Sequence, residues 1–134
     1  MALCRNLANT NRSGDTVTAS RFDIVTLNTP RTNELSKFWA DLLGLQEIER
    51  EDGDRWIVLS DNQGIRRLGF QRGTHRPGGT HLDLVCSLDQ FDAERVRLLA
   101  LQATETRPVR RESYGMIANF VDLDGNAFDL CAYR

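Results

Sequence analysis

The chain has 134 residues, of which 40% are hydrophobic and 27% are charged, and its formal net charge is -2. This length corresponds to one domain whose core needs no disulfide or structural metal, and the charge balance argues against a nucleic-acid partner. No apolar run reaches the roughly 18 to 20 residues of a membrane span, and the first residues lack the apolar core of a secretory signal. Three cysteines without a CxxC spacing favour reduced thiols and a cytoplasmic protein.

The first twenty residues, 1–20, are rich in Asn, Thr, Ser, Gly and Arg and show no periodicity, so we expect a mostly disordered leader. A strand is predicted over 22–27, where the composition is typical of strands. An amphipathic helix follows, ended by Gly44, and its apolar residues recur at the spacing of one helix face. These residues are Leu35, Phe38, Trp39, Leu42 and Leu43.

Three strands are predicted next, joined by turns rich in Asp, Asn and Gly, and they cover 46–50, 56–59 and 65–72. Residues 73–80 contain the best candidate for a linker. The same order of elements then starts again, with a strand over 81–86 and a second helix. The helix is predicted from an apolar stripe of Ala93, Val96, Leu99, Ala100 and Ala103, and the last strands are expected over 104–109, 114–121 and 127–133.

The two halves match without gaps at a shift of 58 residues, which pairs Phe38 with Val96 and Phe70 with Phe128. We therefore predict a single α+β domain made of two tandem βαβββ modules, 21–72 and 81–134. Their strands form a curved mixed sheet around a shared cleft, and the helices cover the outside.

Four segments carry a resemblance to a known family: LSKFWADLLGL at 35–45, RLGFQR at 67–72, HLDL at 81–84 and DLDGNAFDL at 122–130. Together they are similar to the vicinal oxygen chelate superfamily, the glyoxalase/bleomycin resistance/dioxygenase fold, and to its glyoxalase-like subgroup in particular. The match spans about 21–133. The resemblance implies the duplicated fold, a cleft that binds a small molecule, often a divalent metal ion in that cleft, and often a symmetric dimer.

Strand alternation places His81 and Asp129 on the cleft side of their strands, because their neighbours at odd spacing are apolar. The shift of 58 residues adds Asp23 and Gln71 from the first module. The resemblance implies that these four residues hold one divalent ion, of Mn, Fe, Ni, Zn or Mg. The set departs from the family pattern, with Asp23 (or Ile24 in the next register) where a histidine is usual. An equally plausible interpretation is a polar cleft without metal, in which His81 has a carboxylate neighbour.

Trp56 and Tyr114 form a pair under the same shift, followed by Val58 and Met116. These four side chains are candidate walls for a flat organic ligand, and plain core packing is the alternative. Arg107, Arg110 and Arg111 either attract an anionic substrate or form a solvated basic patch. His75 is expected to be exposed in the linker, and Cys131 to be structural because no base lies near it.

Two functions remain open from the sequence. The first is a metal-dependent lyase, isomerase or dioxygenase acting on an oxygen-rich small substrate, as the resemblance implies. The second is a metal-free protein that sequesters an aromatic or antibiotic-like ligand. No catalytic residue is assigned, the partners are a small molecule and a second copy in a homodimer, and neither nucleic acid nor membrane is expected.

Overall fold

The computed structural model of the chain describes residues 9–10, 16–17, 22–78 and 81–134. Two short strands, β1 (Asn9–Thr10) and β2 (Thr16–Val17), pair antiparallel within the segment expected to be a leader. The rest of that predicted leader, and the end of the predicted linker at 79–80, lie outside the described residues.

The first module follows the predicted order of elements. Its sheet has the strand order β3-β6-β5-β4, in which β3 and β6 are parallel and the other pairs are antiparallel. Its elements are β3 (Val25–Thr29), α1 (Thr32–Leu43), β4 (Gln46–Glu51), β5 (Trp56–Ser60) and β6 (Arg66–Arg72).

The second module repeats this arrangement, with the order β7-β11-β10-β8 and a parallel pair of β7 with β11. Of the strand predicted over 104–109, β8 covers the first two residues, and a separate strand, β9, follows after that range; both pair with β10. The elements are β7 (His81–Val85), the 3-10 turn η1 (Leu88–Gln90), α2 (Phe91–Ala100), β8 (Thr104–Glu105), β9 (Arg110–Glu112), β10 (Gly115–Val121) and β11 (Ala127–Tyr133). The prediction of two βαβββ modules is therefore confirmed.

Helix α1 forms as its apolar spacing predicts. Leu35 and Trp39 are fully buried, Phe38 and Leu42 nearly so, and Leu43 stays at the edge of the buried stripe. Gly44 ends the helix with a φ of 67°, a left-handed conformation that glycine adopts without steric cost.

Helix α2 buries a different face from the one predicted. Phe91 and Leu98 are its buried residues, whereas Val96 is 62% exposed. The cause is η1, an additional turn that places the start of the helix at Phe91 and so changes which side chains face the sheet. Phe91 and Leu98 then correspond to Leu35 and Leu42 of α1.

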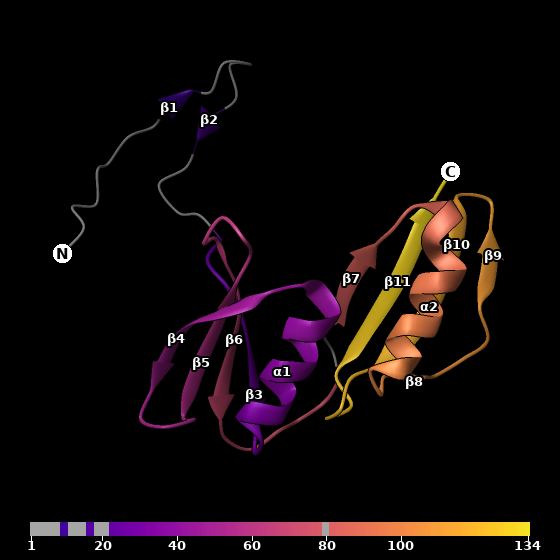
Figure 1. Cartoon of the computed structure of the whole chain (residues 1–134). Coiled ribbons are helices and arrows are strands. Elements are labelled where there is room, and N and C mark those ends of the chain that lie inside the picture. The colour runs from indigo at the N-terminus through magenta and orange to yellow at the C-terminus, as the bar shows by residue number, and fades with distance from the viewer. Residues whose placement is uncertain (1–8, 11–15, 18–21, 79–80) are drawn as a thin grey trace.

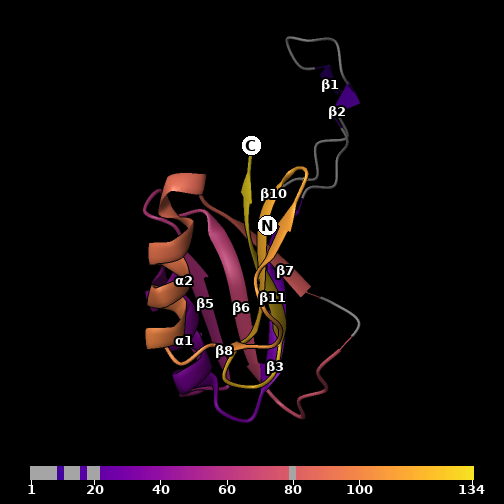
Figure 2. The ribbon, with the colours of Figure 1, turned by 90° about the vertical axis from the view of Figure 1, so that its right-hand side faces the viewer.

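The two modules lie side by side, with both helices on the same side of the two sheets (Figures 1 and 2). One hydrophobic core runs through both modules. At their junction the ring centroid of Trp39 in α1 lies 5.1 Å from that of Phe128 in β11. The opposite faces of the sheets, which we call the inner faces, carry no helix formed by the part of the chain that the structure describes. No helix among the described residues is long and apolar enough to cross a bilayer.

Candidate functional site

Three potential metal ligands meet on the inner face of β7 and β11. The parallel register sets Asp83 directly beside Asp129, with His81 two residues earlier on the same face. His81 Nε2 lies 3.4 Å from an oxygen of Asp83 and 3.8 Å from Oδ2 of Asp129. One ligand atom from each residue lies within 4.8 Å of the others, and among the described residues this is the group of His, Cys, Asp and Glu that could hold an ion.

Asn119 fixes the orientation of Asp129. The two residues are directly opposite each other in the β10–β11 pair, and Asn119 Nδ2 donates a hydrogen bond of 2.6 Å to Asp129 Oδ1. This bond leaves Oδ2 directed at His81. The side-chain oxygen of Asn119 is buried and meets no donor among the described residues. Such a buried acceptor is costly unless a ligand or water pairs with it.

His81, Asp129 and Asn119 line an open cavity of about 480 Å³, which the linker residue Gly78 and Arg107 also border. Arg107 is exposed and makes no ion pair with any of the described residues. Its guanidinium therefore gives the rim of this cavity a positive charge that an anionic group can pair with. Of the three arginines singled out in the sequence, Arg107 is the one at this cavity.

The first-module residues predicted for the site lie elsewhere. Asp23 forms an ion pair of 3.1 Å with Arg66, and neither Asp23 nor Gln71 borders the cavity of His81. The strand registers explain this: Asn28 stands beside Gln71 in the first module, as Asp83 stands beside Asp129 in the second. The constant shift of 58 residues does not extend to the first strand.

The four predicted ligand-wall residues do not form one wall. Trp56 and Val58 lie on the inner face of the first module, where Trp56 is directly opposite Gln71 and Val58 is fully buried. Met116 packs against the core instead, and the ring of Tyr114 lies 6.1 Å from that of Tyr133, tilted by 44°.

Asn119 is the residue of the second module that corresponds to Trp56. Trp56 is directly opposite Gln71 of β6, and Asn119 is directly opposite Asp129 of β11, which corresponds to Gln71. Sequence reasoning missed Asn119 because the register of the β10–β11 hairpin is set by the Asp122–Asn126 loop. The alternation of β10 together with that register would have found it.

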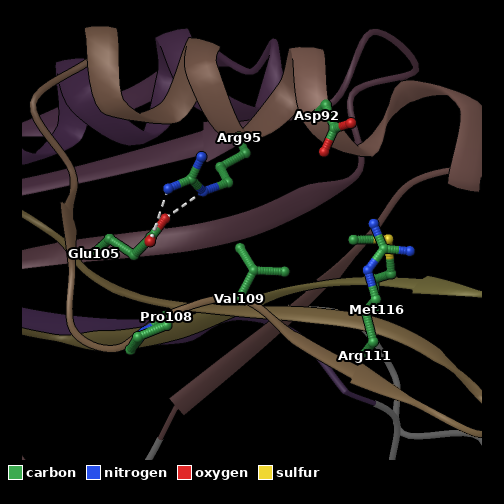
Figure 3. Close-up of a pocket in the computed structure, with 7 residues that line it drawn as sticks. All are labelled: Asp92, Arg95, Glu105, Pro108, Val109, Arg111 and Met116. Atoms are coloured by element: carbon green, nitrogen blue, oxygen red, sulfur yellow. Dashed lines mark hydrogen bonds and ion pairs between the residues drawn. The ribbon is translucent and has the colours of Figure 1, made fainter.

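A second cavity, of about 790 Å³, opens between α2 and β9 and is shown in Figure 3. Arg95 of α2 stands where α1 carries Trp39, and it donates hydrogen bonds of 2.5 and 2.9 Å to Glu105. The Arg95 guanidinium lowers the pKa of Glu105 and is itself held charged. Because this acid and base neutralise each other, the cavity offers little for chemistry.

The cysteine thiols are also poor candidates for a nucleophile. Burial raises the pKa of both Cys86 and Cys131, and Cys131 is nearly inaccessible. A thiol that stays protonated reacts slowly, in agreement with the structural role expected for Cys131.

Comparison with known proteins places the chain in a family. The model of the glyoxalase-like domain matches residues 24–131, and a search of curated proteins finds no significant relative. A mutant of the fosfomycin resistance protein FosX from Listeria monocytogenes, complexed with Mn(II) and 1S,2S-dihydroxypropylphosphonic acid, superposes with a TM-score of 0.70 at 20% identity, covering 86% of this chain and 91% of that one.

Two further solved structures are similar. A glyoxylase/bleomycin resistance protein/dioxygenase domain from Frankia sp. EAN1pec has a TM-score of 0.66 at 24% identity and covers 86% and 93% of the two chains. A glyoxalase-related enzyme from Fulvimarina pelagi has a TM-score of 0.69 at 18% identity and covers 84% and 87%. At these identities the structures show a shared fold. The chain therefore belongs to the glyoxalase-like domain family, within the vicinal oxygen chelate superfamily.

Proposed function

We propose that the protein is a divalent-metal-dependent enzyme that acts on an anionic, oxygen-rich small molecule, as a lyase, isomerase or dioxygenase. The observation that carries this proposal is the meeting of His81, Asp83 and Asp129 within 4.8 Å of one another, at a cavity that His81 and Asp129 line. Two donors that share an ion at about 2.1 Å are separated by about 3 to 4 Å. The separations of 3.4 and 3.8 Å from His81 Nε2 fit that range.

The donor chemistry also fits. One imidazole and two carboxylates suit Mn, Fe, Ni, Zn or Mg, and the two aspartates would balance the charge of a divalent ion. Asp83, which shares a strand face with His81, takes the place of the ligands expected from Asp23 and Gln71. Such an ion, when bound, acts as a Lewis acid on oxygen atoms of a substrate.

The remaining residues of the cavity have distinct tasks. Asn119 holds Asp129 in one rotamer, as supporting hydrogen bonds do for metal-ligating carboxylates. Arg107 binds the anionic part of the substrate at the rim. Support for an anionic substrate also comes from the FosX neighbour, which was solved with Mn(II) and a phosphonic acid.

Metal analysis tests the proposal, and the chain offers a matched control because it contains two histidines. The protein, purified without chelators, should hold about one divalent ion per chain. We expect His81→Ala to lose this ion and His75→Ala to keep it. A wild-type chain that binds no Mn, Fe, Ni, Zn or Mg when dialysed against each of them would refute the metal function.

A metal-free binding protein for a flat organic ligand is the second candidate. Two features of the first module favour it. The inner face of this module supplies no ligand to the His81 group, and the ring of Trp56 lies over Gly69 on that face, where a flat ligand could contact it. Trp39 is fully buried, so quenching of tryptophan fluorescence by anthraquinone-2-sulfonate would report on Trp56. Unchanged quenching in a Trp56→Phe variant would contradict this role.

We also propose that the protein is a homodimer. The support is that no helix or strand of the described residues covers either inner face (Figure 2). In addition, Val85 and Tyr133, which continue the inner face beyond Asp83 and Asp129, are 69% and 56% exposed. Light scattering should give twice the mass of 15.2 kDa. A single-chain mass at micromolar concentration would contradict it.

A further inference from the structure

The linker between the modules borders another polar cavity, which lies on the inner side and is distinct from the two cavities described above. This cavity has a volume of about 500 Å³ and is lined by Thr26, Asn28, Thr74, His75, Arg76 and Asn126. All six side chains are polar. It lies beside the cavity of His81, because Gly78 of the same linker and Ala127, the neighbour of Asn126, line that one.

His75 is not the exposed linker residue that the sequence suggests. Its ring is half-buried, and Nδ1 lies 3.2 Å from the backbone oxygen of Asn28. Because a carbonyl oxygen only accepts hydrogen bonds, Nδ1 is the donor, and in the tautomer with its proton on Nδ1 the other ring nitrogen, Nε2, is an acceptor. Nε2 is buried and has no partner among the described residues. The group that best satisfies it is therefore a hydrogen-bond donor.

Arg76, next to His75, has the opposite requirement. Its side chain is exposed and makes no ion pair or hydrogen bond with the other described residues. A guanidinium at the wall of a polar cavity binds a carboxylate or another oxyanion most strongly. The threonine hydroxyls and the asparagine amides of the same cavity both donate and accept hydrogen bonds, which suits a ligand with several hydroxyl groups.

We propose that this linker cavity is a binding site for a polyhydroxylated organic acid, whose carboxylate pairs with Arg76 and one of whose hydroxyls donates to His75 Nε2. The site is separate from the proposed metal centre, since none of its six lining residues belongs to the His81 group. A volume of about 500 Å³ is ample for a six-carbon acid, which is at the small end of ligands bound in protein cavities.

The test uses the His81→Ala variant, in which His75 is the single histidine and the proposed metal ligand is gone. Its imidazole NMR signals are followed during titration with gluconate, with sorbitol and with hexanoate. Gluconate has both the charge and the hydroxyls, sorbitol lacks the charge, and hexanoate lacks the hydroxyls. We expect a saturable shift with gluconate, and binding at least about tenfold weaker with each of the other two.

The outcomes separate the parts of the inference. No saturable shift with gluconate overturns the site, equal binding of sorbitol overturns the role of Arg76, and equal binding of hexanoate overturns the hydroxyl donor to Nε2. Titration of the metal-free wild-type chain guards against misfolding of the variant. Arg76→Gln should weaken gluconate binding about tenfold and Arg107→Gln should not; the reverse result would place the ligand in the His81 cavity and refute the proposal. None of these results depends on whether the wild-type chain binds a metal.

Discussion

Replacement of Asp122 by alanine should destabilise the protein, because it removes a hydrogen bond that links the two modules. Asp122 is 4% exposed, and its carboxylate accepts hydrogen bonds from Trp39 Nε1 at 3.0 Å, from the backbone nitrogens of Asp124 and Asn126 at 2.9 and 2.8 Å, and from Asn126 Nδ2 at 2.8 Å. Three of these bonds shape the loop between β10 and β11. The fourth ties that loop to α1 in the other module.

The size of the effect follows from what the substitution leaves unpaired. The indole N–H is buried and loses its acceptor, which costs about 1 to 3 kcal/mol. The three loop donors are part-buried and can turn partly to water, so together they cost about 1 to 2 kcal/mol. We expect Asp122→Ala to lower the free energy of unfolding by about 2 to 5 kcal/mol, or the melting temperature by roughly 6 to 20 °C.

Urea unfolding followed by circular dichroism measures this loss, and a double-mutant cycle with Trp39→Phe isolates the indole bond. Because Trp39→Phe already removes the N–H donor, the loss caused by Asp122→Ala should be smaller in that background by about 1 to 2 kcal/mol. A loss below about 1 kcal/mol in Asp122→Ala, or no coupling in the cycle, would refute the reasoning.

Three further changes have expected outcomes. Asn119→Ala removes the hydrogen bond that orients the Asp129 carboxylate. Calorimetry should show an affinity for the divalent ion that is about tenfold to a hundredfold weaker, with the fold retained. Unchanged affinity would mean that Asn119 does not position this ligand. Gly115→Ala should prevent folding, as judged by circular dichroism, because φ is 145° and a Cβ there would overlap the carbonyl oxygen of Ala132; a folded variant would contradict that geometry. Arg95 lowers the pKa of Glu105 below the ordinary value of 4.5 for a glutamate, so the stability this pair contributes is present above pH 4.5 and is lost as the pH falls through the lowered pKa. Glu105→Gln should therefore cost about 1 kcal/mol at pH 7 and progressively less in acid, and an equal cost at pH 3 would contradict the ion pair.

The sequence predicts the fold well because periodicity and turn composition are local properties. Leu35, Trp39 and Leu42 lie on one face of α1 whatever the rest of the chain does. The second helix shows the limit of this reasoning: the small apolar residues Ala93 and Ala100 suggest a stripe, but η1 sets the phase and the large Phe91 and Leu98 become the buried residues.

For a related reason, the sequence predicts the strand face of some residues of the candidate site but not of others. His81 and Asp129 follow from alternation within single strands, which the structure keeps. The assignment of Asp23 required the two first strands to share one register against their partners. That register depends on which side chains pack across the sheet, since β3 pairs Thr26 with Gly69 where β7 pairs His81 with Ala127. A fixed shift along the sequence cannot contain that information.

The guanidinium of Arg97 in α2 donates hydrogen bonds of 2.5 and 3.2 Å to the backbone oxygens of Leu42 and Asp41, at the end of α1. One half of the duplication thus completes a helix terminus belonging to the other. The first half, expressed as a fragment, would lose the donor to these carbonyls, and the second half would keep only the ion pair of Arg97 with Glu94, so neither is expected to be stable alone. We therefore expect the intact chain to unfold in a single cooperative transition. The two modules repeat one pattern of elements, but each depends on the other for its stability.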